Sequence, residues 1–531
     1  MRNADLIIEF LVANGIDRIF SLSGNQIMPI YDACIGRPIQ IIHVRHESAA
    51  VFMAEAYAQI TGQVGVALVT AGPGFTNSLG AVFSAKMSET PILLLSGDSQ
   101  VSQDGTGAFQ ELDQVTMSRP VTKRSIRCTK PENLLDSLQT ALSTALEERR
   151  GPAHLALPQD ISTANWRGVT DVDLRYVGEI DPGLSDNDVQ TITDQLVEAS
   201  HPLILTGPAG ADSRSGTANH RLKMAFGLPV IAAESPRGLK DPALGEFAGL
   251  LERADLVVCL TKRVDYVLGF GHLKETRGQK WIVIDPDREV LELAQHNLGK
   301  QLIGSYQAAL EPARTQLADS LAKRQRCSSV WTQEVSRALA ARATLENGAD
   351  AMTSDAVCRV IQRIVGQFAT AIFIADGGEF GQWAQATITA PRRLINGLSG
   401  AIGGCLCYGL ATKLARPEAT CFVLMGDGTA GFHFMEFETA VRENIPFVCV
   451  IGNDGKWNAE HQIQLRDYGP DRLIGCDIGR YRYDAMVAAI GGHGEHVTIL
   501  SELEPALYRA IESGLPACVN VEIEGIPAPV L

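Results

Sequence analysis

The sequence predicts an α/β protein with three doubly wound parallel-sheet domains, and three observations support this prediction. Short apolar runs recur without polar alternation, which is typical of strands buried on both faces. Helical patterns separate these runs, and glycine-rich turns follow several of them. With 531 residues, the chain is long enough for about three domains at about 150 residues each. The predicted strands are Ile41 to Val44, Val64 to Val69, Ile92 to Leu95, Leu203 to Leu205, Val230 to Ala233, Leu256 to Leu260, Trp281 to Ile284, Ala371 to Ala375, Cys421 to Met425 and Phe447 to Ile451.

Two polar stretches divide the chain. Residues from about Asp160 to Asp188 are irregular and include Gly168. The stretch from Ala308 to Leu345 is a charged helical pattern that ends in a polar segment around Asn347. Such stretches are typical of linkers. We therefore expect domains over residues 1–170, 185–330 and 350–531.

Composition and charge exclude several classes of protein. The formal net charge is −15, so nucleic acid is not expected as a partner. The apolar runs have the length of strands, far below the roughly 20 residues that cross a bilayer, and the first residues lack the pattern of a signal peptide. We expect a cytoplasmic protein without a membrane partner. The eleven cysteines mostly lie in apolar runs and are interpreted as reduced core residues, and no zinc-type spacing occurs.

The strongest chemical pattern lies in the third segment. Asp427 follows one predicted strand and Asn453 ends the next, 453 − 427 = 26 positions later, with one predicted helix from about Met435 to Glu443 between them. A carboxylate, an amide oxygen and the backbone carbonyl of Gly455 form a hard-oxygen set that suits Mg²⁺ and leaves positions for phosphate oxygens and water. The Gly-Asp-Gly tripeptide alone would indicate a tight turn, but the spacing and the strand context favour a metal site.

Two more glycine-rich segments lie in this part of the chain. Asp376 to Gly381 follows a predicted strand and leads into a helix, whose N-terminus can bind an anion. The alternative is an ordinary turn between a strand and a helix. Gly397 to Gly404 contains enough glycine for a flat heterocycle to lie against the backbone, and Ile402 within it is either a ligand contact or a core residue.

In the first segment, Glu47 follows the strand Ile41 to Val44 at the start of a helix rich in small residues. A carboxylate at this place is most often a cap that the helix dipole stabilises. A carboxyl group that faces a ring nitrogen in an apolar pocket would instead be a suitable proton relay.

The segment GDGTAGFHFMEFETAVRENIPFVCVIGND, from Gly426 to Asp454, resembles the binding motif of the thiamine-diphosphate-dependent enzymes. By this resemblance Asp427, Asn453 and the carbonyl of Gly455 hold the magnesium that anchors the diphosphate of the cofactor. The family usually has two adjacent asparagines at this turn, whereas this chain has Gly452 at the first position. The resemblance further implies that Gly72, Pro73, Asn77, Gly378, Glu379, Phe380, Ser399, Gly400, Ile402, Gly426, Gly428 and Thr429 bind the cofactor, with Ile402 holding its bent shape.

The resemblance assigns catalysis to Glu47. In the family a glutamate in this context hydrogen-bonds the aminopyrimidine ring of the cofactor and so promotes removal of the C2 proton. The substrate-side candidates that the resemblance implies are Gln26, Phe109, Gln110, Lys123 and Trp457; surface polar residues and one core phenylalanine are the alternative reading. The three domains would be the pyrimidine-binding, central and diphosphate-binding domains. The active sites would be shared between the chains of a homodimer or homotetramer.

Within the family, the chain is most similar to the acetolactate synthase group, which includes benzaldehyde lyase and 2-hydroxyacyl-CoA lyase. The resemblance implies an enzyme that makes or breaks a carbon–carbon bond and acts on a small 2-oxo acid or acyloin. Val267 replaces the second arginine of the synthases, Gly245 to Gly249 does not match their FAD-associated loop, and Gly469 to Gly475 is closer to benzaldehyde lyase. FAD is therefore not favoured. A catalytically silent cofactor-binding protein is the alternative from another class, and Glu47 argues against it.

Overall fold

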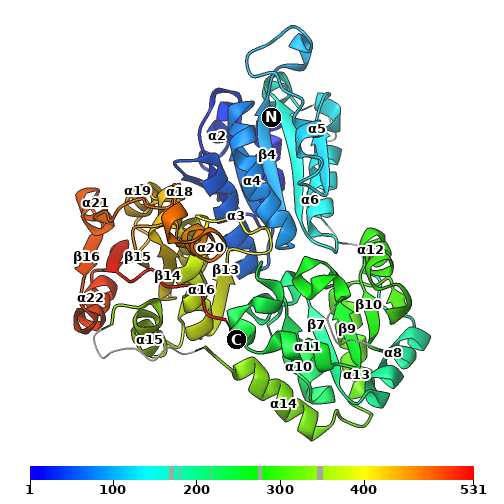
Figure 1. The fold of residues 1–531 in the computed structure, drawn as a ribbon. Helices are drawn as coiled ribbons and strands as arrows, with labels where there is room; N and C mark the ends of the chain where they lie inside the picture. Colours follow the sequence, from blue (N-terminus) through cyan, green and yellow to red (C-terminus); the bar gives the residue numbers. More distant parts are fainter. Residues whose placement is uncertain are drawn as a thin grey trace. The chain divides into compact units, whose positions relative to one another are not determined.

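The computed structural model describes residues 1–166, 173–176, 178, 181–216, 218–272, 278–343 and 351–530. It contains three sheets, of six, five and six strands, and every recorded strand pair within them is parallel. The predicted α/β class with three parallel sheets is therefore confirmed (Figure 1). The expected polar segments around Gly168 and Asn347 lie outside the described residues, and the exact domain boundaries stay predictions.

The first sheet has the strand order β2-β1-β3-β4-β6-β5. Its central strands β3 and β4 are buried along their whole length, as expected for parallel strands that are covered on both faces. Its strands are β1 (Arg18–Ser21), β2 (Gln40–His43), β3 (Gly65–Val69), β4 (Ile92–Asp98), β5 (Arg124–Arg127) and β6 (Pro152–Pro158). Its helices are α1 (Asn3–Ala13), α2 (Met28–Ala33), α3 (Glu47–Thr61), α4 (Pro73–Met87), α5 (Gln114–Ser118), α6 (Leu134–Leu146) and α7 (Gln159–Thr163).

The third sheet has the order β13-β12-β14-β15-β17-β16. One helix here differs from the prediction, because a helix starts directly at Asp427 and precedes the expected one. The strands are β12 (Ile372–Ala375), β13 (Arg392–Ile395), β14 (Cys421–Gly426), β15 (Val448–Asn453), β16 (His493–Val497) and β17 (Ala517–Glu522). The helices are α15 (Ser354–Val365), α16 (Gly378–Thr387), α17 (Cys405–Ala415), α18 (Asp427–His433), α19 (Glu436–Arg442), α20 (Asn458–Tyr468), α21 (Tyr483–Ala489) and α22 (Leu500–Glu512).

The first and third sheets belong to one compact unit, which comprises residues 1–178, 347–381 and 393–527. Helix α3 packs against α17, and the rings of Phe52 and Tyr408 meet edge to face with their centroids 6.0 Å apart. Buried residues of both helices contribute to a single hydrophobic cluster. The close approach needs glycine, because a Cβ on Gly404 would lie 2.8 Å from the ring of Phe52.

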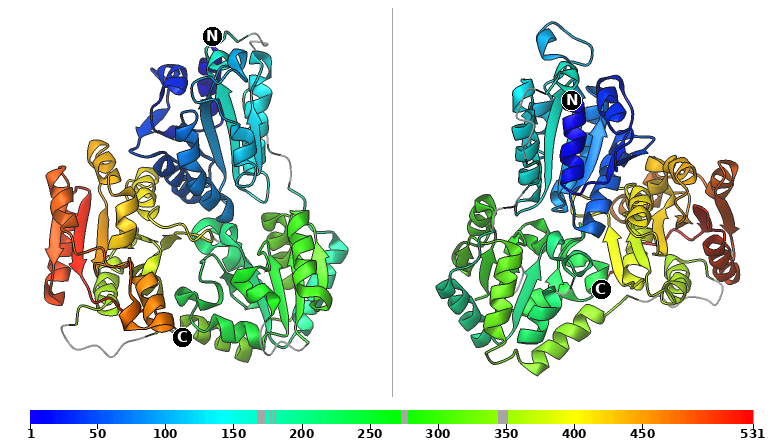
Figure 2. Two further views of the ribbon diagram at one scale, coloured as in Figure 1. Left: turned by 45° about the horizontal axis from the view of Figure 1, so that its top comes forward. Right: turned by 180° about the vertical axis from the view of Figure 1, so that it is seen from behind.

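The second sheet lies in the other compact unit, residues 179–346, 382–392 and 528–531. Its order is β11-β10-β9-β7-β8, and helices cover both faces (Figure 2). The strands are β7 (Pro202–Thr206), β8 (Val230–Ala232), β9 (Leu256–Leu260), β10 (Lys280–Ile284) and β11 (Leu302–Tyr306). The helices are α8 (Asp186–Glu198), α9 (Asp212–Ser215), α10 (Ala218–Phe226), α11 (Phe247–Arg253), α12 (Arg288–Leu298), α13 (Leu310–Leu321) and α14 (Ser329–Ala340).

Two sequence-based expectations can be compared with these elements. The segment expected as a charged helical linker forms α13 and α14, and both helices have buried faces within the second unit. All eleven cysteines carry free thiols, and ten of them are buried. Across the described ranges, no helix is both long enough and apolar enough to cross a membrane.

Candidate functional site

The predicted metal ligands meet where two neighbouring strands end. Gly426 of β14 pairs with Gly452 of β15, so Asp427 and Asn453 follow directly at the same edge of the sheet. Their side chains are almost completely buried, and the backbone N–H of Gly455 donates to Oδ2 of Asp427 at 3.0 Å. Within the described part of the chain, Oδ1 of Asn453 is buried and has no hydrogen-bond partner. A buried amide oxygen without a donor suits a cation ligand.

The charges at this turn also fit a cation. Burial and the neighbouring Asp454 carboxylate raise the pKa of Asp427 to about 7. Burial raises the pKa of Asp454 to about 6. Two carboxyl groups that are hard to ionise together become easier to ionise beside a divalent cation. No cluster of three His, Cys, Asp or Glu residues that could hold a metal occurs among the described residues, so any site here must use Asn453 or a backbone oxygen.

The third expected ligand, the carbonyl oxygen of Gly455, already has hydrogen-bond partners. The carbonyl oxygen of Gly455 accepts hydrogen bonds from the backbone N–H groups of Ile478, at 2.9 Å, and Gly479, at 3.1 Å. The left-handed backbone of Gly455, with φ of 72°, accompanies this orientation. Metal ligation by this oxygen would therefore require it to share or to exchange these bonds, whereas Asp427 and Asn453 need no such change.

A buried aspartate holds the two other glycine-rich turns together. Asp376 follows β12 and is fully buried, and its carboxylate accepts the backbone N–H of Gly377 at 2.7 Å, Gly403 at 3.0 Å and Cys405 at 3.2 Å. A Cβ on Gly377 would lie 2.8 Å from Cγ2 of Ile402. The turn before α16, with Gly378, thus lies against the segment that carries Ser399, Gly400 and Ile402. Sequence reasoning did not assign this role to Asp376, although the residue stood at the expected strand end.

In the first sheet, Glu47 starts α3 and is 8% exposed. Its Oε2 accepts a hydrogen bond from Nδ2 of Asn77 at 3.1 Å, and a Cβ on Gly74 would lie 3.4 Å from its Oε1. Gly72, with φ of 57°, ends the turn before Pro73 starts α4. The structure therefore brings together Glu47 and the predicted turn that follows β3.

The substrate-side candidates fall into three places. Nε2 of Gln26 donates to Oε1 of Gln110 at 2.8 Å, and Thr70 donates to Oε1 of Gln26 at 2.7 Å. A Cβ on Gly72 would approach Cβ of Gln110 to 3.0 Å, so this pair lies at the turn beside Glu47. Phe109, on the same loop, is 75% exposed.

The other two candidates lie elsewhere. Lys123 precedes β5, and its Nζ donates to the carbonyl of Glu147 at 2.6 Å. All strands here are parallel, so Lys123 lies at the amino edge of the sheet, opposite the edge that carries Glu47. The structure does not bring Lys123 to the Gln26 and Gln110 pair within one chain. The adjacent strand ends that carry Asp427 and Asn453 are here called the metal turn. Trp457 lies beside it, because a Cβ on Gly428 would come within 2.8 Å of its ring.

The link between the first and third sheets passes through the neighbour of Glu47. Oγ of Ser48 and Nε2 of His433 are 2.7 Å apart, and Nδ1 of His433 is 2.8 Å from the carbonyl of Gly403. Glu47 accepts a hydrogen bond from Asn77, and the Asp427 carboxylate accepts one from Gly455. Among the described residues of one chain, no hydrogen bond joins Glu47 to the metal turn.

Comparison with known proteins assigns the family. A family model described as "Thiamine pyrophosphate enzyme, N-terminal TPP binding domain" matches residues 1–117, and one described as "Thiamine pyrophosphate enzyme, C-terminal TPP binding domain" matches residues 376–521. The chain is 32% identical to a "Probable acetolactate synthase" of Mycobacterium bovis, over 98% of this chain and 95% of that protein. The chain belongs to the thiamine pyrophosphate enzyme family. The predicted family is therefore confirmed, and with it an enzyme similar to acetolactate synthase that depends on thiamine diphosphate.

Relatives with another printed name cover almost the same length. The chain is 28% identical to "2-hydroxyacyl-CoA lyase 2" of Bos taurus, and 27% identical to the protein of that name from Homo sapiens. Each alignment covers 97% of this chain and 88% of the relative. These relatives agree with the stated alternative of a 2-hydroxyacyl-CoA lyase.

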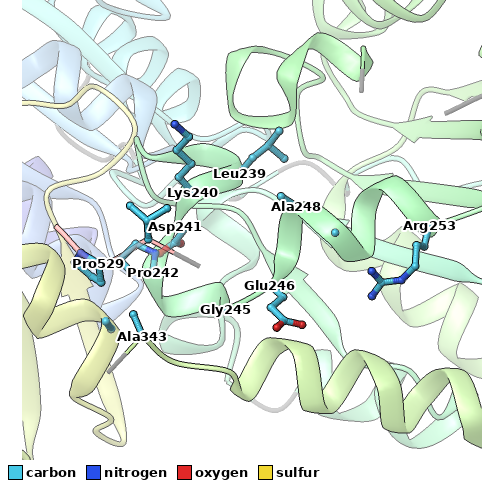
Figure 3. Close-up of a pocket in the computed structure, with 13 residues that line it drawn as sticks. Leu239, Lys240, Asp241, Pro242, Gly245, Glu246, Ala248, Arg253, Ala343 and Pro529 are labelled. Carbon is cyan, nitrogen blue, oxygen red and sulfur yellow. The ribbon is translucent and has the colours of Figure 1, made fainter. Parts of the chain in front are cut away.

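The second compact unit of this thiamine pyrophosphate enzyme contains a pocket (Figure 3). Its lining includes Lys240, Asp241, Glu246 and Arg253, and Pro529 of the C-terminal segment. The loop Gly245 to Gly249, which does not match the FAD-associated loop of the synthases, forms part of this lining. The expectation that the enzyme works without FAD stays a prediction.

Proposed function

We propose that this enzyme makes or breaks a carbon–carbon bond beside a carbonyl group of a small 2-oxo acid or acyloin, with Mg²⁺ as the anchor of the cofactor diphosphate. The observation that carries the proposal is the pair of Asp427 and Asn453 at adjacent strand ends, where Oδ1 of Asn453 is buried without a partner in the described chain. Thiamine diphosphate supplies an electron sink for such a reaction when it is bound.

Each group of residues has a part in this proposal. Asp427 and Asn453 bind the magnesium, and Gly455 joins them if its carbonyl exchanges its present bonds. The diphosphate lies against the turns that contain Gly426, Gly428, Thr429, Gly378, Glu379 and Phe380. Ser399, Gly400 and Ile402 orient the rings, and Gly72, Pro73 and Asn77 form the pyrimidine side. Glu47 would hold the pyrimidine ring by a hydrogen bond and so promote loss of the proton that must leave the cofactor before it reacts, and at 8% exposure its carboxyl group is largely shielded from bulk water.

Substrate contacts are proposed for Gln26, Gln110 and Phe109, with Trp457 on the side of the metal turn. Gln26 and Gln110 already form a hydrogen-bonded pair beside Gly72, and such a pair can orient a carbonyl or a hydroxyl group. Because Glu47 and Asp427 have separate partners within one chain, we propose that each active site is shared between two chains of a homodimer or homotetramer. The cytoplasmic location expected from the sequence stays a prediction.

A panel of substrates tests the reaction class. We would measure CO₂ release from pyruvate and longer 2-oxo acids, and aldehyde release from acyloins such as benzoin and from 2-hydroxyacyl-CoA, with and without thiamine diphosphate and Mg²⁺. The proposal expects turnover of a 2-oxo acid or an acyloin that requires both additions. Turnover of 2-hydroxyacyl-CoA alone would support the second candidate, which the 28% identical Bos taurus lyase favours. A protein that binds the cofactor and turns over no member of the panel would contradict both.

A further inference from the structure

The buried side chains of Asn520 and Asp484 form a series of hydrogen bonds with the amide of Asn453. Nδ2 of Asn453 donates to Oδ1 of Asn520 on β17 at 3.1 Å, and to the carbonyl of Tyr481 at 3.0 Å. Nδ2 of Asn520 donates to the same carbonyl at 3.0 Å and to Oδ1 of Asp484 at 3.1 Å. Asn453 and Asn520 are fully buried and Asp484 is 4% exposed, so water does not compete for these bonds.

The donor and acceptor of each hydrogen bond in this series follow from Asp484. The Asp484 side chain accepts three hydrogen bonds from Arg482, from Nε to Oδ1 at 3.0 Å and to Oδ2 at 3.2 Å and from Nη2 to Oδ2 at 2.6 Å. An ionised carboxylate can only accept, so Asn520 must turn its NH₂ group towards Asp484. Its oxygen then faces Asn453, which must turn its own NH₂ group towards Asn520.

The remaining polar atom of that amide is Oδ1. With Nδ2 engaged by Asn520 and Tyr481, Oδ1 of Asn453 is left without a partner in the described residues. A rotated amide would place Oδ1 against two acceptor oxygens and present NH₂ to a cation. Both changes are unfavourable, because acceptors repel each other and an amide nitrogen does not bind Mg²⁺.

We propose that Asp484 and Asn520 are positioning residues that hold Oδ1 of Asn453 towards the magnesium ion. This inference rests on the proposed function, because it takes Asn453 as a metal ligand. It adds two residues to which neither the motif nor the comparisons assign a role. The outer partners of metal ligands typically change metal affinity by about 10 to 100-fold when they are removed.

Four variants of the full-length enzyme test the proposal. N520L removes both bonds of the Asn520 amide, and we expect Mg²⁺ affinity to fall by about 10 to 100-fold. N520D keeps an acceptor for Asn453 but also sets a carboxyl group against Asp484 and the Tyr481 carbonyl, so it should lose affinity on its own and serves as the parent of the double variant. D484N replaces the acceptor-only group by an amide that can also donate, so Asn520 is free to turn, and we expect a loss of about tenfold. The double variant D484N/N520D places the acceptor-only group directly beside Asn453 and should recover most of that loss.

The measurement is a Mg²⁺ titration at saturating thiamine diphosphate. Calorimetry and tryptophan fluorescence detect the binding, and Trp457 is the reporter at the site because its ring borders Gly428. Melting temperatures without metal report whether each variant is folded. As a matched control, N219D changes a buried asparagine of the second unit that makes comparable hydrogen bonds, and it should leave Mg²⁺ affinity unchanged.

The outcomes separate this inference from the proposed function. If the parent enzyme binds the cofactor equally well without Mg²⁺, the proposed metal site fails. If the parent requires Mg²⁺ but N520L keeps full affinity, the positioning role is wrong and the metal site stands. Should N520L not fold, the comparison of D484N with D484N/N520D decides alone, and no recovery in the double variant overturns the inference.

Discussion

The ring of Phe380 fills the space into which a side chain at Gly452 would project. A Cβ on Gly452 would lie 2.5 Å from Cγ of Phe380, closer than any real Cβ contact. Gly452 stands where the family usually has the first of two asparagines, and Phe380 lies in the first turn of α16. The glycine that departs from the family motif therefore leaves the space that the ring of Phe380 occupies.

The first prediction follows from this contact. Gly452→Ala should lower the stability of the metal-free enzyme by about 1 to 3 kcal/mol, because the phenyl ring must move. Thermal or urea unfolding measures the effect. The matched control is Gly426→Ala on the paired strand, where a Cβ would meet nothing within 4 Å, so little change is expected. Equal losses in the two variants would show that the Phe380 contact is not the cause.

Several central strands could be predicted because their sequences are continuous apolar runs. Strands β4, β9 and β14 are apolar runs covered on both faces, and the sequence analysis placed all three. The edge strand β11 was missed, because its residues alternate between half-buried and exposed. The edge strand β16 contains two histidines and a glutamate and has no apolar run.

Some residues of the candidate site could also be predicted from the sequence, and others could not. Asp427 and Asn453 could be paired from the sequence, since consecutive parallel strands carry them to one edge. Asn520 could not be found, because it reaches Asn453 across 67 positions through the pairing of β15 with β17. Lys123 was grouped with Gln110 because of the resemblance of their segments to acetolactate synthases, but the topology takes it to the opposite edge of the sheet.

The second prediction concerns the metal. Asp427→Asn keeps an acceptor for the N–H of Gly455 but removes the charge, so we expect Mg²⁺-dependent cofactor binding to be lost while the metal-free enzyme stays folded. In the parent, Mg²⁺ affinity should fall as the pH drops below about 7, because the cation must displace the proton of a carboxyl group whose pKa is about 7. Calorimetry at several pH values measures both effects. Unchanged affinity in the variant would remove Asp427 from the site.

The third prediction concerns acid stability. Burial lowers the pKa of His154 to about 3, so the unfolded chain binds a proton between pH 6.5 and 3 that the folded chain rejects. The stability of the folded chain that depends on neutral His154 is therefore fully present above pH 6.5, and it is lost as the pH falls towards 3. At pH 5 the loss should be about 2 kcal/mol. His154→Asn should show a shallower decline in urea unfolding between pH 7 and 5, and identical slopes would contradict this origin.

The fourth prediction concerns shared active sites. If Glu47 and Asp427 of one site come from different chains, mixing Glu47→Gln chains with Asp427→Ala chains creates hybrids with one intact site. Random exchange should restore about a quarter of the parental activity, since about half of the dimers are hybrids and each hybrid has one of two sites intact. Each variant alone should be nearly inactive. No recovery after subunit exchange has been verified by mass spectrometry would contradict sharing.

The last prediction separates two roles of Glu47. As a cap at the start of α3, its carboxylate would mainly stabilise the helix, and its replacement would cost about 1 kcal/mol and leave turnover almost unchanged. As the proton relay, it would be needed for the exchange of the C2 proton of bound thiamine diphosphate. Glu47→Gln keeps an acceptor for Asn77 and should keep cofactor affinity, but we expect exchange to slow by about 10² to 10⁴-fold.

Nuclear magnetic resonance after quenched mixing in D₂O measures that exchange, with melting temperature and cofactor affinity recorded on the same samples. The chain offers a matched control in Glu436, a buried glutamate that also starts a helix and accepts the backbone N–H of Arg45 at 2.9 Å. Glu436→Gln should lower the melting temperature without slowing exchange at C2. Exchange as fast in Glu47→Gln as in the parent would assign Glu47 to the helix alone, because a carboxyl group that carries the proton cannot be replaced by an amide without loss of rate.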